Sequence, residues 1–326
     1  MSKFFKLSVL IFLLAGVGMS STTNAQWQPT TLKDNRFSAE FGVKLLDRPG
    51  DELGLPLISD RPTNATLFDA SQASDLGGAV GAEVKFNFET GFGRELEFRT
   101  ILADWSEDAT QISGPDLVSP FFPVAGSEPT DVSYGYGSDY FSVELMARRA
   151  VRPGVTFMFG PRIISTKDEV TLSGSLTVNP VTGGAPITVT QTTVTEATNI
   201  LLGGQTGFEF NLPVNQSVWA NAYIRAGGYF NPTEVNQSVA NNTSLAPPIT
   251  NTATENTGSF MAEVGGRVYV DLLPNAATLY VGYEANWIDG IALAPAQLLT
   301  DFTTNGIETT TTPFFHAVTA GIRVQY

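Results

Sequence analysis

His316-Ala317-Val318-Thr319-Ala320-Gly321-Ile322-Arg323-Val324-Gln325-Tyr326 is the end of the sequence, and from Val318 onward every second side chain is apolar. Thr, Gly, Arg and Gln occupy the positions between them. A period of two puts alternate side chains on opposite faces of a β-strand. The stretch therefore predicts a strand with one face toward apolar surroundings and the other toward polar ones.

The same period recurs along most of the chain, in pieces of the length that a tilted strand needs to cross a membrane, about 9–11 residues. Together with the C-terminal piece these stretches predict ten strands. They are Phe37–Leu45, Val80–Phe88, Glu95–Trp105, Tyr140–Arg149, Val155–Ser165, Thr198–Asn211, Ser217–Phe230, Phe260–Asp271, Ala277–Trp287 and Phe314–Tyr326.

The connections between these stretches alternate in length. The short ones carry Pro or Gly and are Glu89–Arg94, Val151–Gly154, Leu212–Gln216 and Leu272–Asn275. The long ones are Asp47–Ala79, Ser106–Asp139, Thr166–Ala197, Asn231–Ser259 and Ile288–Pro313. Short periplasmic turns and long extracellular loops are typical of outer-membrane barrels. The sequence predicts an all-β fold, a single antiparallel up-and-down transmembrane β-barrel of about ten strands.

Two alternatives stay open. The Thr-rich stretch from Val170 to Val194 would form a further hairpin, which either extends the barrel wall above the membrane or raises the strand count to twelve. A secreted β-sandwich also alternates, but it does not explain the regular change between short and long connections.

The N-terminus predicts export. Lys3 and Lys6 precede an apolar run from Leu7 to Met19, and small residues at Thr23–Ala25 suit signal peptidase. We expect a signal peptide over residues 1–25 and a barrel over residues 26–326. The alternative is an uncleaved N-terminal anchor, although the run is shorter than the roughly 20 residues of a membrane helix. The sequence contains no cysteine, which excludes a lipoprotein anchor and disulfides.

The C-terminal strand resembles the signal by which outer-membrane barrels are recognised for assembly. Ile322, Val324 and the terminal Tyr326 carry this resemblance. It implies that the barrel assembly machinery and outer-membrane lipid are partners of the chain, and that the protein lies in the outer membrane.

Three internal segments resemble a family of outer-membrane barrels from planctomycetes and other Gram-negative bacteria, related to the Legionella-type major outer membrane protein. The segments are Asn199–Gly207, Ala226–Tyr229 and Gly282–Gln297. The resemblance implies an outer-membrane location, a barrel architecture and pore formation. It implies no catalytic residues.

The alternation places nearly all strand charges on one face. A charge on the lipid face costs up to about 2–4 kcal/mol at the bilayer midplane, so this face is expected to line the lumen. Equal numbers of acids and bases favour ion pairs that fill a narrow or plugged lumen, and the alternative is a path for small solutes lined by the same charges. The predicted lumen residues are Glu40, Lys44, Glu83, Lys85, Glu95, Glu97, Arg99, Glu144, Arg148, Arg162, Glu209, Arg225, Glu263, Arg267, Glu284 and Arg323.

The long connections are rich in acids. Such a mouth concentrates cations through its summed field, and its oxygen ligands suit divalent cations that bridge to anionic lipid. The alternative is that the acids only keep the loops soluble. No stretch has the spacing of a dedicated calcium loop, so we predict no specific metal site and no cofactor. The acids include Asp51, Glu52, Glu107, Asp108, Asp131, Asp168 and Glu169.

The overall balance of 18 basic against 32 acidic residues makes nucleic acid an unsuitable partner. His316 is the only histidine, and its place in the strand points it toward lipid. Nucleophile–base chemistry therefore has no evident candidates, and we expect that the chain is not an enzyme. The predicted function is porin-like, a narrow passage that favours cations. The alternative is a non-conducting structural and interaction barrel that displays acidic loops.

Overall fold

The computed structural model describes residues 37–49, 56–60, 63, 65–69, 77–91, 94–114, 117–118, 130–178, 185–242, 248–273, 276–298, 306–309 and 311–326. The predicted signal peptide lies outside these residues, as do Asp51 and Glu52. No helix in the described part of the chain is long and apolar enough to cross a membrane.

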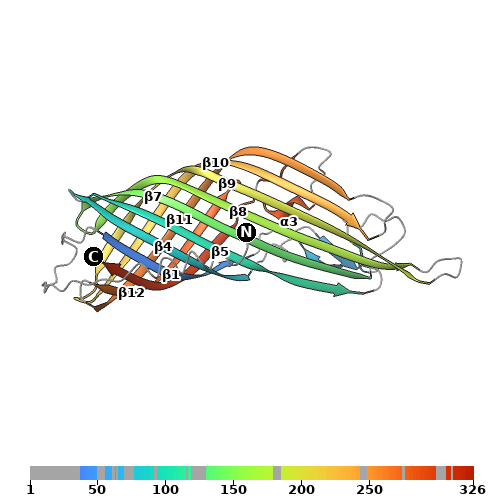
Figure 1. The fold of residues 1–326 in the computed structure, drawn as a ribbon, viewed down its shortest axis with the longest axis horizontal. Coiled ribbons are helices and arrows are strands. Elements are labelled where there is room, and N and C mark those ends of the chain that lie inside the picture. The colour runs from blue at the N-terminus through green and yellow to red at the C-terminus, as the bar shows by residue number, and fades with distance from the viewer. Residues whose placement is uncertain are drawn as a thin grey trace. The chain divides into compact units, whose positions relative to one another are not determined.

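Ten antiparallel strands close into one barrel, in the order β1-β13-β12-β11-β10-β9-β8-β7-β5-β4 (Figure 1). Phe41 of β1 pairs with Val84 of β4 on one side and with Ile322 of β13 on the other, which completes the ring. The prediction of a ten-strand barrel is confirmed. The barrel strands are β1 (Phe37–Arg48), β4 (Gly77–Gly91), β5 (Arg94–Ser113), β7 (Asp131–Arg152), β8 (Val155–Val178), β9 (Ile187–Pro213), β10 (Val218–Asn241), β11 (Ile249–Leu273), β12 (Ala277–Asp289) and β13 (Phe314–Gln325).

One end of the barrel, called here the turn end, carries the four short connections between β4 and β5, β7 and β8, β9 and β10, and β11 and β12. Gly154 in one of them has φ +74°, a conformation that glycine adopts without the steric cost of a side chain. The described strands at both chain ends also meet here, where Tyr326 N donates to Phe37 O over 3.0 Å. The opposite end is called the loop end.

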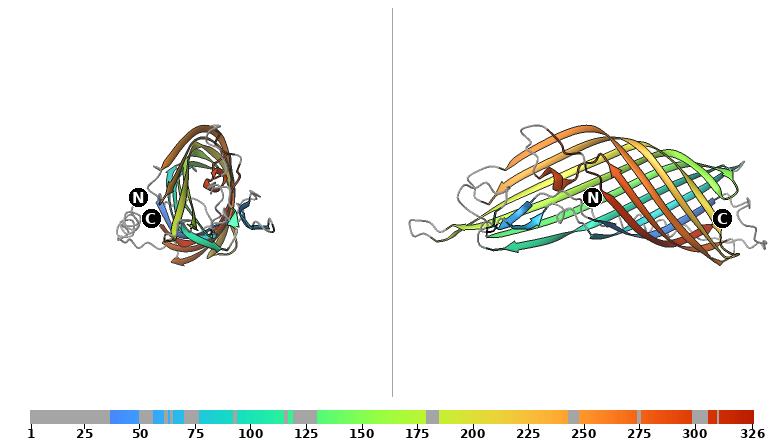
Figure 2. Two further views of the ribbon diagram at one scale, coloured as in Figure 1. Left: turned by 90° about the vertical axis from the view of Figure 1, so that its right-hand side faces the viewer. Right: turned by 180° about the vertical axis from the view of Figure 1, so that it is seen from behind.

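The wall is much taller on one side. Strands β7 to β11 have 22 to 27 residues, whereas β1, β12 and β13 have 12 or 13 (Figures 1 and 2). The β8–β9 ladder runs without interruption to the Val178–Ile187 pair. The Thr-rich stretch around it therefore extends the wall at the loop end and does not add barrel strands. We call the long part of β7 to β11 the tall wall.

A three-stranded sheet, in the order β3-β2-β6, lies outside the barrel ladder. Its strands are β2 (Pro56–Asp60), β3 (Ala65–Asp69) and β6 (Leu117–Val118). Ile58 and Phe68 are buried in the same apolar cluster as barrel residues, and the Phe68 ring lies 5.0 Å from that of Tyr134 on β7. The predicted long connections thus contain ordered structure that alternation alone did not indicate.

The outward face of the barrel carries a belt of exposed apolar side chains. Belts of this extent on a folded protein mark contact with lipid or another apolar surface. The belt includes Val43, Leu45, Val80, Phe88, Leu145, Phe159, Ile163, Leu202, Phe208, Ile224, Phe260, Val264, Val268, Leu279, Val281, Trp287, Val318 and Ile322.

A break in the β7–β8 ladder occurs at Gly160 and Pro161, which form no pairs with the facing strand β7, while the register is the same on both sides. A Cβ on Gly160 would lie 1.9 Å from the backbone oxygen of Leu145. We expect Gly160→Ala to destabilise the barrel by about 1–3 kcal/mol because the strands must move apart.

The matched control for this prediction is Gly228→Ala, since a Cβ there meets nothing within 4 Å. Denaturant unfolding in phospholipid vesicles would measure both variants. Equal midpoints for the two would show that the close approach at Gly160 is not needed.

Candidate functional site

The lumen in the turn-end half of the barrel is filled by charged side chains, which we call the ionic layer. Seven are acidic and seven are basic, and all are buried. The acids are Glu40, Glu83, Glu97, Glu144, Glu209, Glu263 and Glu284, and the bases are Lys44, Lys85, Arg99, Arg148, Arg162, Arg225 and Arg267.

Arg99 is the centre of the ionic layer. Its Nη2 lies 2.8 Å from Glu83 Oε2 and 2.6 Å from Glu284 Oε2. Its Nη1 lies 3.0 Å from Glu263 Oε1. Lys44 also contacts Glu83, over 3.1 Å, and donates a hydrogen bond to Glu284. One guanidinium thus joins carboxylates from β4, β11 and β12 across the lumen.

A second group lies on β7 to β11. Arg162 Nη1 lies 2.7 Å from Glu263 Oε2, and Arg225 Nη1 lies 2.6 Å from Glu144 Oε1. Arg225 Nη2 continues the chain of contacts to Glu97 over 3.1 Å. The second group is therefore continuous with the first through Glu263.

Toward the turn end, the layer ends in three further contacts. Lys85 Nζ lies 2.9 Å from Glu40 Oε2, which also accepts a hydrogen bond from Arg267 Nη1 over 2.8 Å. Arg148 Nη2 donates to Glu209 Oε1 over 2.7 Å. Because every buried charge of the layer has an opposite partner, the layer avoids the large cost of an isolated buried ion.

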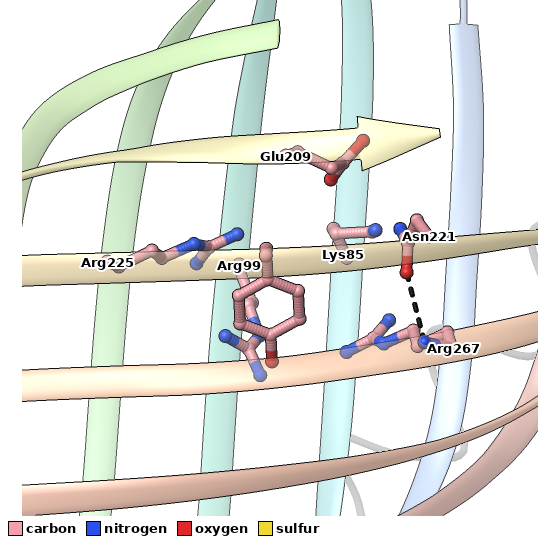
Figure 3. Close-up of a pocket in the computed structure, with 7 residues that line it drawn as sticks. Lys85, Arg99, Glu209, Asn221, Arg225 and Arg267 are labelled. Carbon is pink, nitrogen blue, oxygen red and sulfur yellow. Dashed lines mark hydrogen bonds between the residues drawn. The ribbon is translucent and has the colours of Figure 1, made fainter. Parts of the chain in front are cut away.

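One small cavity lies inside the layer. Figure 3 shows the residues around one cavity of about 10 Å³, close to the minimum for a single water. Its lining residues are Lys85, Arg99, Glu209, Asn221, Tyr223, Arg225 and Arg267.

The loop-end half of the lumen is largely apolar, with one buried ion pair among the described residues. Arg48 Nη1 lies 3.2 Å from Asp168 Oδ1, and Ser138 Oγ donates to the same oxygen over 2.5 Å. Tyr136 OH donates to Asp168 Oδ2 over 2.9 Å. Asp168 was expected among the acidic loops, and this is wrong: β8 continues past the predicted strand end and turns this residue inward.

The segment Gly290–Leu298 folds into the lumen, and we call it the plug. Ile291–Ala294 are completely buried, and α3 (Ala294–Gln297) adds one buried helical turn. Gly290 has φ +78°, which allows the sharp change of direction after β12. The prediction of an extracellular loop over Ile288–Pro313 is therefore wrong for the plug, because its apolar side chains are buried against the inner wall.

Asn199 on β9 anchors the plug through its amide. Asn199 Nδ2 donates to Ala292 O over 2.7 Å, and Ala292 N donates to Asn199 Oδ1 over 2.9 Å. Asn231 Nδ2 and Ser259 Oγ donate to Gly290 O over 3.1 Å and 2.7 Å. These side chains satisfy backbone groups that the plug removes from water.

The plug is also held from its C-terminal side. Gln297 Nε2 donates to Glu308 O over 2.6 Å, and Glu308 N donates to Gln297 Oε1 over 3.0 Å. Thr311 Oγ1 donates to Ile291 O over 2.5 Å. Sequence analysis missed these anchors, since a lone Asn or Gln carries no signal of the backbone it will meet.

The remaining predicted residues lie at the edges of the site. Arg323 and Glu95 are partly exposed, with side-chain exposures of 22% and 48%. Ile322, Val324 and Tyr326 lie on the outward face of the last strand, where Ile322 and Tyr326 are exposed. Of the other expected loop acids, Glu107 and Asp108 belong to β5, Asp131 lies at the start of β7, and Glu169 is exposed on β8.

His316 faces outward, as predicted, but it is not isolated. Its Nε2 lies 3.0 Å from Asp47 Oδ2 on the neighbouring strand β1. Within the described ranges, no group of three or more His, Cys, Asp or Glu side chains is arranged to hold a metal ion.

The outward surface of the tall wall is polar, with many hydroxyl side chains. Ser173 and Thr192 share a hydrogen bond of 3.2 Å across β8 and β9. Lys167 Nζ lies 2.6 Å from Glu196 Oε2, and this hydrogen bond raises the pKa of Lys167. The apolar belt therefore gives way to a hydroxyl-rich surface toward the loop end.

A closed antiparallel sheet, an outward apolar belt and an inward ionic layer together decide the architecture. The fold is that of an outer-membrane β-barrel. The sequence matches no known family model and no curated protein.

Several solved structures are similar to this chain in fold and distant from it in sequence. The outer membrane protease OmpT from Escherichia coli shares 9% identity at a TM-score of 0.45, covering 91% of this chain and 99% of that one. The translocator domain of autotransporter NalP from Neisseria meningitidis shares 9% at a TM-score of 0.40, covering 99% and 95%. The toluene transporter TodX from P. putida shares 9% at 0.33, covering 90% of each chain.

These likenesses include both a protease and a transporter. The expectation that the chain is not an enzyme, drawn from the lack of nucleophile–base candidates, is contradicted, because the solved barrels similar to this chain include a protease. Identities of 9% transfer neither activity to the present chain.

Proposed function

We propose that this protein is a closed barrel of the Gram-negative outer membrane, with a structural and interaction role and without a conducting path. The observation that carries the proposal is the filling of the lumen, by the ionic layer in one half and by the plug in the other. The alternative from the sequence, a narrow porin-like passage that favours cations, needs a continuous path through both halves.

The outer-membrane location rests on the apolar belt together with the closed ring of strands. In lipid every backbone polar group needs a partner within the protein, and only helices and closed barrels provide this. Each barrel strand pairs with two neighbours over the belt, so its backbone groups are satisfied there except at the ladder break beside Gly160 and Pro161. The hydroxyl-rich tall wall would then project outside the cell as the surface for interaction.

Closure of the lumen is supported from both ends. The cavity in the ionic layer has about 10 Å³, whereas a hydrated cation needs several times the space of one water. Beyond it, Leu293 and Ala294 of the plug are completely buried inside the tall wall. Equal numbers of buried acids and bases also leave the layer without a net sign that would select ions.

Single-channel recording in planar bilayers tests this function. We expect no conductance steps from protein whose folding is established by a different gel mobility before and after boiling. Cation-selective steps from such folded protein would contradict the closed barrel and restore the porin-like passage. The recording should include a known porin purified in the same detergent as the positive control.

We also propose membership of the family that includes the planctomycete barrels and the Legionella-type major outer membrane protein. Two of the three resembling segments contain the plug anchor Asn199 and the plug itself, at Gly290–Gln297. The proposal further includes removal of residues 1–25 on export and recognition of Ile322, Val324 and Tyr326 by the assembly machinery. Intact mass of the purified protein would show whether it begins at Gln26.

A further inference from the structure

The cavity in the ionic layer has a wall of unusual charge (Figure 3). Four of its lining side chains are cationic, namely Lys85, Arg99, Arg225 and Arg267, and one, Glu209, is acidic. The carboxylates that neutralise the four cations are not among the lining residues. The space itself therefore faces mainly positive groups, although the whole layer is neutral.

The one lining acid is already engaged. Glu209 Oε1 accepts hydrogen bonds from Arg148 Nη2 over 2.7 Å and from Asn211 Nδ2 over 3.1 Å. Neither donor residue lines the cavity. The negative charge of Glu209 is thus partly balanced from behind, which lowers its repulsion of a second negative group.

Donor capacity remains at the cavity. Arg225 is 4% exposed, and its Nε is buried without a hydrogen-bond partner among the described residues, while its two terminal nitrogens bind Glu144 and Glu97. The side-chain oxygen of Asn221 accepts a hydrogen bond from Arg267 N over 3.1 Å. The remaining polar atom of this amide, Nδ2, is a hydrogen-bond donor. The ammonium group of Lys85 can donate three hydrogen bonds, and its contact with Glu40 Oε2 at 2.9 Å uses only one of them.

The size of the space limits its occupant. A cavity of about 10 Å³ holds one water or one monatomic ion of similar size. This size favours a monatomic ion over phosphate, sulfate or an organic acid. Lys85 and Asn221 are 6% and 7% exposed. Asn221 is three residues from the start of β10 at the turn end, so a small ion can enter the cavity from that end.

From this charge, donor set and size we propose that the cavity is a binding site for one halide anion, chloride in ordinary media. The anion would accept from Arg225 Nε, Lys85 Nζ and Asn221 Nδ2 and would satisfy the buried donor of Arg225. Its effect would be on stability, because an anion that binds only the folded barrel stabilises it in proportion to the logarithm of its concentration.

Crystals of the full-length mature protein grown in bromide test the site directly. We expect an anomalous peak in the cavity in contact with Lys85 and Asn221. In solution, the unfolding midpoint should rise when gluconate is exchanged for chloride at constant ionic strength, since gluconate is too large to enter. Each tenfold increase in chloride above its Kd should raise the folding constant tenfold, about 1.4 kcal/mol.

Asn221→Asp replaces a donor by a negative charge and should abolish both the bromide peak and the chloride dependence. The matched control is Asn286→Asp on β12, also a buried amide, which does not line the cavity and should keep both. If Asn221→Asp does not fold, Lys85→Gln tests the same site by removing a different cationic donor. Glu40 keeps Arg267 as a partner in that variant, so its charge stays compensated. Water alone in the cavity with bromide present, or a midpoint that is equal in chloride and gluconate, would overturn the proposal.

Discussion

Replacement of Arg99 by methionine is expected to lower the free energy of unfolding by about 3–5 kcal/mol, because removal of one partner leaves buried charges uncompensated. Arg99 is 1% exposed and contacts Glu83, Glu263 and Glu284 within 3.0 Å. Methionine is close in volume and keeps most of the packing, so the loss reports on charge. Unfolding by denaturant in phospholipid vesicles, followed by tryptophan fluorescence, measures it.

A second substitution separates charge from packing. Glu284→Gln added to Arg99→Met restores neutrality, and Lys44 keeps Glu83 as a partner over 3.1 Å. We expect the double variant to be more stable than Arg99→Met alone. Arg323→Met is the control at the margin of the layer, where the contact with Glu40 is 3.9 Å and the expected loss is at most about 1 kcal/mol. A double variant less stable than the single one would show that the layer does not act through charge balance.

Asn199→Asp is expected to release the plug from the wall. The change keeps the shape of the side chain but replaces the donor to Ala292 O by a second acceptor, and it buries a charge in an apolar region. Loss of the hydrogen bond together with burial of the charge should cost several kcal/mol. Hydrogen exchange of the Ala292 amide, which donates to Asn199 Oδ1 over 2.9 Å, should become much faster.

The control for the plug is Asn256→Asp, the same change at an exposed position of β11, which should leave exchange of Ala292 unaltered. The same exchange measured on Asn199→Asp at acidic pH is a further test. The carboxyl group that this substitution introduces can, once protonated, again donate to Ala292 O. Protection of the Ala292 amide, measured against its intrinsic exchange rate at each pH, should then return as pH falls. Unchanged exchange at neutral pH would mean that burial of Ile291–Leu293 alone holds the plug.

Much of the barrel could be predicted from the sequence because the alternation of side chains that determines it is local to each strand. Each crossing strand must place apolar side chains toward lipid at every second position, so Val43 and Leu45 face out while Lys44 faces in. The four short turns then define which end of the barrel is which. The strand ends were less predictable, since β8 and β9 continue as a paired ladder after the apolar alternation ceases.

The ion-pair partners inside the lumen could not be predicted from the sequence in this way. Lys44 donates to Glu284, 240 residues away, and the pairing depends on the stagger and closure of the ring. The inward direction of these charges is a property of each strand, whereas the choice among seven buried carboxylates is a property of the closed barrel.

The last strand shows the same division. By itself the sequence from His316 to Tyr326 determined a strand with an apolar outward face and, with the nine other stretches, a ten-strand barrel, because side-chain alternation is set residue by residue. Only the tertiary structure decided that Asp168 pairs with Arg48, that Gly290–Leu298 fills the lumen, and that a cation-lined cavity remains. Those features depend on which surfaces become adjacent once the ring closes, and burial of apolar and charged groups is then resolved among distant parts of the chain.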